Sequence, residues 1–141
     1  MRRRLPSVLI LPVSWFLLAS CAPSTKQVLA TSESQVKLRA IQTRAFDTTD
    51  KNKMLRTVIA TLQDLGFIID KADATLGTVS ATKLDRYNLK ATVTVRERGD
   101  SQLLVRANAQ YNITPVEDPE PYQQFFNSLS KAIFLTAHEV D

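Results

Sequence analysis

The chain of 141 residues contains one cysteine, Cys21, and one histidine, His138, the side chains best suited to nucleophilic or metal chemistry. A catalytic thiol needs a nearby base, but these two residues stand near opposite ends of the chain and outside any recognisable nucleophile signature. With no second cysteine, Cys21 cannot form a disulfide within the chain. Zinc sites need several clustered histidine, cysteine or carboxylate ligands, so we expect no metal site.

The acidic residues also form no pattern that is typical of an active site. Asp70 and Asp73 flank an expected turn, and the hydrogen bonding of turns accounts for both. His138 and Glu139 are neighbours in sequence, and adjacent helical residues do not face each other. Three scattered glycines cannot build a phosphate-binding loop. We therefore expect a protein that is not an enzyme and that uses no cofactor.

The residues before Cys21 indicate another use for its thiol. "MRRR" is positively charged, and "LPSVLILPVSWFLLA" is apolar apart from two serines. This run is too short to cross about 30 Å of hydrocarbon comfortably. A basic start, a short apolar run and small residues before a cleavage site are typical of a secretory signal. A buried N-terminal helix is the alternative, but the run lacks the polar face that such a helix needs. We predict that residues 1–20 are a signal peptide.

Leu18, Ala19, Ser20 and Cys21 resemble the lipobox of bacterial lipoproteins at all four positions. In that family the thiol receives a diacylglycerol, the signal is cut before the cysteine, and the new amino group is acylated. The resemblance implies that acyl chains on Cys21 anchor the mature protein to a membrane. Several chains hold firmly where one does not, because each buried methylene contributes only about 0.8 kcal/mol. Ala22 stands where the inner-membrane members usually have aspartate, which implies the outer membrane and a domain facing the periplasm.

Most of the positive charge lies in the predicted signal peptide. The whole chain has 18 Lys and Arg against 14 Asp and Glu, a net charge of +4. Cleavage removes Arg2, Arg3 and Arg4 and no acid, which leaves 15 basic against 14 acidic residues and a net charge of +1. A nearly neutral domain lacks the basic surface that attracts phosphate backbones. We expect no nucleic-acid partner.

The mature chain predicts a tether followed by one folded domain over residues 36–141. Residues 21–35 are polar, small and without periodicity, as in a flexible tether. A loose alternation of apolar side chains predicts a strand within residues 36–47. Near the end of that segment, Arg44 and Asp47 could form either a salt bridge or a contact with a partner.

Two helices are predicted in the domain. Residues 48–67 carry an apolar stripe at helical spacing, and Thr49 or Asp50 can cap the first turn. Gly66 stands where a left-handed residue would end this helix. A second, aromatic-rich helix follows "PVEDPEP". Its apolar stripe consists of Tyr122, Phe125, Phe126, Leu129, Ala132 and Ile133.

Four extended segments lie between the helices, at residues 67–71, 77–83, 88–98 and 101–112. In the last two, apolar and polar side chains alternate over eight or more residues, which is typical of half-buried antiparallel strands. The order β-α-β-β-β-β-α predicts an α+β fold. We expect a single domain with an antiparallel sheet of four to five strands and both helices on one face.

The stretch "LQDLGFIIDKADATLGTVSATK" resembles a pattern that recurs in envelope lipoproteins of Gram-negative bacteria. A helix ends in Gly-Phe, a strand follows, and then come Asp, a short gap, Gly and another strand. Gly66, Phe67, Asp73 and Gly77 carry the resemblance, which extends more loosely over residues 47–111. The pattern is similar to the helix-grip domains of BamC, a subunit of the outer-membrane β-barrel assembly complex. It implies a BamC-like helix-grip fold.

Polar residues of the last two strands are expected on the sheet face away from the helices. This face would present Arg96, Arg106, Asn108 and Gln110. It is either simply solvated or a docking surface for another envelope protein. The tether and the lack of catalytic residues favour a non-enzymatic accessory or scaffolding subunit of a membrane-associated assembly.

A carrier is the alternative function. The helices and the sheet could enclose a groove for a lipid or another apolar ligand, with Phe125 or Phe126 among its lining residues. The two hypotheses differ in what accompanies the protein: a subunit would bring another protein, and a carrier would bring a small molecule.

Overall fold

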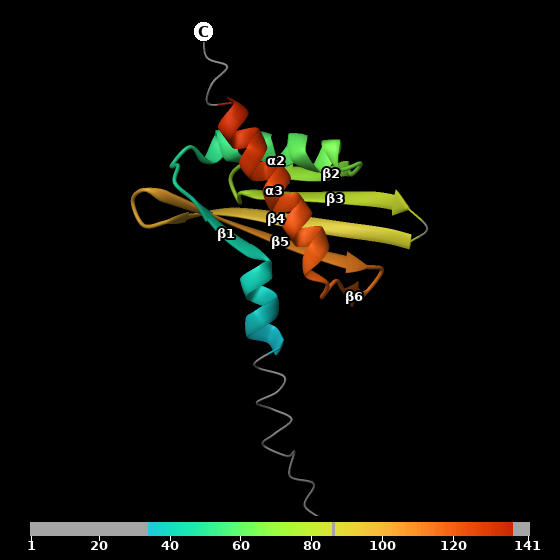
Figure 1. Cartoon of the computed structure of the whole chain (residues 1–141). Helices are drawn as coiled ribbons and strands as arrows, with labels where there is room; N and C mark the ends of the chain where they lie inside the picture. The colour runs from blue at the N-terminus through green and yellow to red at the C-terminus, as the bar shows by residue number, and fades with distance from the viewer. Residues whose placement is uncertain (1–33, 86, 137–141) are drawn as a thin grey trace, which may run out of the picture.

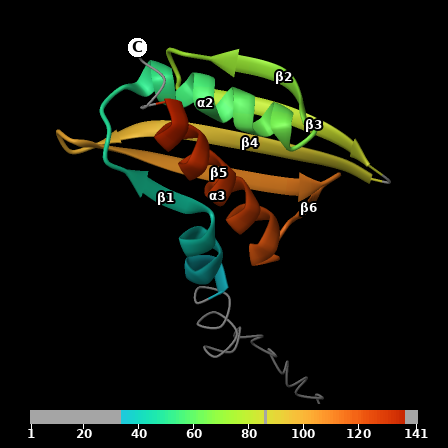
Figure 2. The ribbon, with the colours of Figure 1, turned by 45° about the horizontal axis from the view of Figure 1, so that its top comes forward.

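Six strands form one antiparallel sheet, and two long helices pack on the same face of it (Figures 1 and 2). The computed structural model describes residues 34–85 and 87–136. The predicted signal peptide, Cys21, most of the tether, His138 and Glu139 lie outside the described residues. After a helical segment at residues 34–41, the elements are β1 (Thr43–Phe46), α2 (Lys51–Asp64), β2 (Ile68–Asp73), β3 (Thr78–Asp85), β4 (Tyr87–Arg98), β5 (Gln102–Tyr111), β6 (Thr114–Pro115) and α3 (Pro119–Thr136).

The strand order is β1-β5-β4-β3-β2, with the two-residue β6 pairing with β5. This confirms the predicted α+β fold, the antiparallel sheet and the two helices on one face. β6 was not predicted, because two residues are too short to show a period of two. The long strands β4 and β5 pair from Leu89 opposite Tyr111 to Arg98 opposite Gln102 and form the centre of the sheet.

Both ends of α2 follow the predicted local chemistry. The Asp50 side chain accepts a hydrogen bond from the Lys53 backbone N–H at 2.8 Å, which satisfies a free donor of the first turn. Gly66 has a φ of +84°, a conformation that costs other residues about 1–2 kcal/mol. The predicted stripe was Leu55, Val58, Ile59, Leu62 and Leu65, of which Ile59 and Leu65 are only half-buried, while Met54, Thr57 and Thr61 join the buried face. The two threonine hydroxyls donate to carbonyls four residues earlier, so burying them leaves no unsatisfied donor.

The strand predicted within residues 36–47 is wrong in its first half. Residues 34–41 are helical, and the strand begins only at Thr43. Leu38 and Ile41 are both half-buried and lie three residues apart, which is a helical spacing, and Ile41 packs against the core. The Gln42 backbone N–H donates to Leu38 O at 3.1 Å, as in a helix. The apolar residues of so short a segment fit the period of a strand as well as that of a helix. The packing of Ile41 against the core favours the helix.

The core lies between the helices and the sheet. Alternate side chains of β3, β4 and β5 point toward the helices, while the opposite set faces away from them. No helix in the described part of the chain covers that outer face (Figure 2). The buried apolar residues are Met54, Leu55, Val58, Leu62, Val79, Ala81, Ala91, Val93, Val95, Leu103, Val105, Ala107, Val116, Tyr122, Phe125, Phe126 and Leu129.

Candidate ligand-binding groove

A groove opens where α2 and α3 move apart above the sheet. The two helices lie close together at the end of the sheet near the β4–β5 hairpin and diverge toward the end near β6 (Figure 2). Between the end of α2, the start of α3 and strands β3 to β5 they leave a cavity of about 400 Å³. This volume falls in the range of about 300–1,000 Å³ that small-molecule sites occupy.

The floor of the groove is low because the inward-facing side chains become small along the central strands, before Leu89 and Tyr111 end the row. Val95 of β4 lies opposite Val105 of β5, and both are fully buried beneath the helices. The next inward pair is Val93 with Ala107, and the one after it is Ala91 with Ala109. Alanine fills much less space than valine or leucine, so the helices cannot close onto the sheet here without side chains to fill the gap. These alanines therefore form the floor of the groove.

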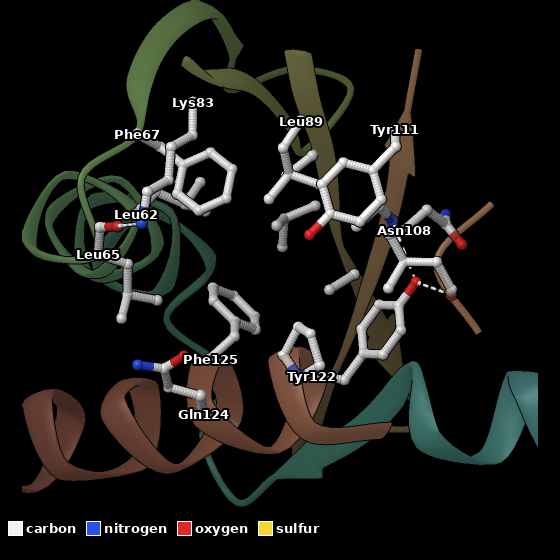
Figure 3. Close-up of a pocket in the computed structure, with 16 residues that line it drawn as sticks. Leu62, Leu65, Phe67, Lys83, Leu89, Asn108, Tyr111, Tyr122, Gln124 and Phe125 are labelled. Atoms are coloured by element: carbon white, nitrogen blue, oxygen red, sulfur yellow. Dashed lines mark hydrogen bonds between the residues drawn. The ribbon is translucent and has the colours of Figure 1, made fainter. Parts of the chain in front are cut away.

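Apolar side chains from the helices form the walls. Leu62 and Leu65 come from the end of α2 and the residue after it, and Phe67 follows Gly66. Phe125 of α3 lines the opposite wall, and its ring meets that of Phe126 edge to face at 5.1 Å between centroids. Figure 3 shows Phe67 and Phe125 on either side of the open space.

Tyr122 fixes the start of α3 against the sheet beside the groove. Its hydroxyl donates to Val116 O at 2.8 Å and accepts from the Ala109 backbone N–H at 3.2 Å (Figure 3). The Gln42 side-chain amide also donates to this oxygen at 3.2 Å. Tyr122 and Gln42 are both buried. One hydroxyl thus joins α3, β5, the segment before α3 and the residue before β1, which holds this wall in place.

Lys83, Tyr111 and Gln124 supply polar atoms to the lining (Figure 3). Lys83 is on β3, in register with Leu89 of β4, and its half-buried side chain runs toward α2. The ammonium donates to Leu65 O at 2.9 Å and lies 5.9 Å from the centre of the Phe67 ring. Lys83 shares the parity of the buried Val79 and Ala81 on β3, but it was not among the residues predicted for a groove, because the sequence does not show where the groove opens.

Phe125 and Phe126 have different positions, although both were predicted as groove residues. Phe125 lines the groove. Phe126 is fully buried in the core, and the Arg44 guanidinium lies 5.1 Å from the centre of its ring. At this distance the two form a cation–π contact. Only Phe125 is therefore available to a ligand in the groove.

The four residues proposed for a docking face lie together on β4 and β5, on the side away from the helices. Arg96 is opposite Leu104, Thr94 opposite Arg106, and the next outward positions of β5 are Asn108 and Gln110. Arg96 and Gln110 are exposed, whereas Arg106 and Asn108 are half-buried.

Arg106 is less available to a partner than the sequence suggested. Its guanidinium contacts the Gln42 side-chain oxygen at 3.5 Å, and its Nε is buried without a hydrogen-bond partner. Asn108 is also half-buried on this face. Arg96 and Gln110 are therefore the accessible members of this set, and the Gln110 amide already donates to Asn112 O at 3.1 Å.

Arg44 and the three aspartates considered in the sequence all form hydrogen bonds within the domain. Arg44 donates to Asn127 Oδ1 at 3.4 Å, and Asp47 accepts from the Gln102 amide at 2.6 Å, so the two do not pair. Asp73 accepts from the Leu76 N–H at 2.9 Å, which confirms its role in a turn. The turn role expected for Asp70 is wrong, because Asp70 lies within β2 and accepts from the Thr82 hydroxyl of β3 at 2.7 Å. Among the described residues, no group of three or more metal-binding side chains comes together.

No protein-family model matches the sequence, and no curated protein matches it significantly. Within residues 34–85 and 87–136, no helix is both long and apolar enough to cross a membrane.

Proposed function

We propose that this protein is a lipid-anchored envelope lipoprotein whose folded domain binds an apolar ligand in the groove between α2, α3 and the sheet. The groove is the observation that carries the proposal. It is about 400 Å³ in volume, and most of its lining residues are aliphatic or aromatic. Water in contact with such a surface is unfavourable, so an apolar molecule that replaces it gains free energy. The proposal includes no catalytic step, metal or cofactor.

The lipobox supports the anchored part of the proposal. Acyl chains on Cys21 would hold the protein to the outer membrane on its periplasmic side, and the first described helical residue lies 13 positions later. Thirteen extended residues span at most about 45 Å, so the domain would stay near the bilayer surface. Lipids and other apolar molecules are concentrated there. A groove held at this distance could receive a ligand from the membrane.

A second candidate is an accessory or scaffolding subunit of an envelope assembly. It is favoured by the outer sheet face, which no described helix covers and which presents Arg96 and Gln110 to solvent. Lys90 and Arg98 lie on the same face of β4, so its charge is predominantly positive. An acidic surface of another envelope protein would complement it.

Recovery from the native membrane distinguishes the two candidates. The acylated protein would be extracted in mild detergent, purified and weighed by native mass spectrometry without unfolding. Ligand binding predicts an added mass of one apolar molecule per chain, which organic solvent removes. A protein bound in fixed ratio, together with an empty groove, would instead support the subunit and overturn the ligand-binding proposal.

A further inference from the structure

The groove has one charged lining residue. Among the 16 described residues that line it, Lys83 is the only one with a positively charged side chain, and none has an acidic side chain. The inward-facing side chains that precede Lys83 on β3 are Val79 and Ala81, both buried. A lysine that continues this row puts a positive charge at the edge of an otherwise apolar space.

The contacts of Lys83 hold its charge in place without neutralising it. Its ammonium donates to Leu65 O, a carbonyl at the end of α2, and lies beside the face of Phe67. A cation is favourable at this end of a helix, which gives Lys83 a structural role. However, an ammonium has three N–H donors, and neither the carbonyl nor the aromatic ring carries a full negative charge. The site can therefore accept an anion as well.

The apolar space and the cation together select an amphiphile. A chain lying on Ala91 and Ala109 would contact Leu62 and Phe125 on either side. Its head would then reach the edge of the groove where Lys83 stands (Figure 3). The cavity is near the lower end of the volumes of ligand sites, which suits one chain better than a complete two-chain phospholipid.

We propose that the ligand is a single-chain amphiphile with an anionic head group, carboxylate or phosphate, and that Lys83 recognises the head. This inference rests on the proposed function, since it specifies the ligand of the same groove. Charge-assisted hydrogen bonds are roughly twice as strong as neutral ones, so the lysine would discriminate against a neutral head on the same chain.

Photo-crosslinking in membranes tests the head group with the complete, acylated protein. Three probes share one photoactivatable tetradecyl chain: tetradecanoate, tetradecyl phosphate and tetradecanol. Crosslinked residues are mapped by mass spectrometry. In the wild type, both anions should label groove residues about tenfold more than the alcohol does, as expected for a hydrogen bond to a charged group. The ratio of the two anions shows which head group is preferred.

Variants of Lys83 separate recognition from structure. Lys83→Met should reduce labelling by both anions about tenfold, to the level of the alcohol, and leave labelling by the alcohol unchanged. Lys83→Arg should retain the preference for anions. Lys90→Met is the matched control, because Lys90 is exposed on the outer face of the neighbouring strand, and it should change nothing.

The outcomes also separate this inference from the proposed function. If all three probes label the groove equally and Lys83→Met changes nothing, the proposal of an anionic head group is contradicted. The groove would then remain a ligand site. If no probe labels the groove in the wild type, the proposed function itself fails. Loss of labelling by tetradecanol in Lys83→Met would show that this lysine only supports the fold, which also contradicts recognition.

Discussion

Ala91 on β4 and Ala109 on β5 lie directly opposite one another in the sheet, with their side chains toward the two helices. Two residues further along the same strands, the equivalent inward pair is Val93 with Ala107, and then Val95 with Val105. The inward-facing side chains thus become smaller from Val95 and Val105 to Ala91 and Ala109, and the larger Leu89 and Tyr111 follow as the next inward pair. The helices meet over the valines and part over the alanines, which makes the groove a consequence of strand register.

The hydroxyl of Tyr122 is expected to stabilise the wall of the groove. Tyr122→Phe removes the hydroxyl that hydrogen-bonds to Val116 O, the Ala109 N–H and the Gln42 amide, each at a distance of 3.2 Å or less. Leaving buried polar groups unsatisfied costs roughly 1–3 kcal/mol, and a domain of this size loses about 4–8 °C in Tm per kcal/mol. Thermal unfolding followed by circular dichroism measures the loss. An unchanged Tm would mean that these hydrogen bonds contribute nothing to stability.

Gly77 is expected to tolerate no side chain. It has a φ of +69°, and a Cβ at this position would collide with the Val95 carbonyl oxygen. Gly99→Ala is the matched control, because Gly99 has a φ of +61° and an added Cβ would meet no atom within 4 Å. Both variants place an alanine in the left-handed conformation, which costs about 1–2 kcal/mol. Because only Gly77→Ala adds a collision, its free energy of unfolding, measured by chemical denaturation, should fall further than that of Gly99→Ala. Equal losses would show that the collision is relieved without cost.

Cys21→Ser is expected to abolish the membrane anchor. A serine hydroxyl does not replace the thiol that the proposed lipid modification requires, so uncut precursor should accumulate. Mass spectrometry of the mature wild-type protein should find an acylated N-terminal cysteine and no tryptophan, because Trp15 lies in the predicted signal peptide. Recovery of unmodified Cys21 with Trp15 still present would contradict the anchored part of the account.

The outer sheet face can be tested separately with Arg96→Glu. Arg96 is exposed and lies away from the groove, so the variant should change the free energy of unfolding by no more than about 0.5 kcal/mol. Ligand recovered with the protein should also be unchanged. If another protein is recovered with the wild type and lost in Arg96→Glu, the docking face proposed for a subunit is supported. Equal recovery from both removes that face from consideration.

Much of the fold follows from local patterns, whereas the groove does not. The long strands show a period of two, and the Asp50 cap and the turn at Asp73 are chemistry that is visible within four residues. The depth of the groove depends on which residues of β4 and β5 stand opposite each other and on how the helices diverge. Lys83 shares the parity of Val79 and Ala81, so the alternation of β3 puts it on the inward face, but the sequence does not show that this position borders a groove.

Filling the groove tests the central claim most directly. Ala91→Leu adds bulk to the floor, while Ala45→Leu adds the same bulk at an exposed position on the outer face of β1. Native mass spectrometry of the protein extracted from its own membrane would compare the mass of bound apolar ligand in both variants with that in the wild type. The account predicts that Ala91→Leu loses the bound molecule and keeps a Tm at or above that of the wild type, while Ala45→Leu retains it. Undiminished ligand in a folded Ala91→Leu protein would contradict the claim that the groove is the binding site.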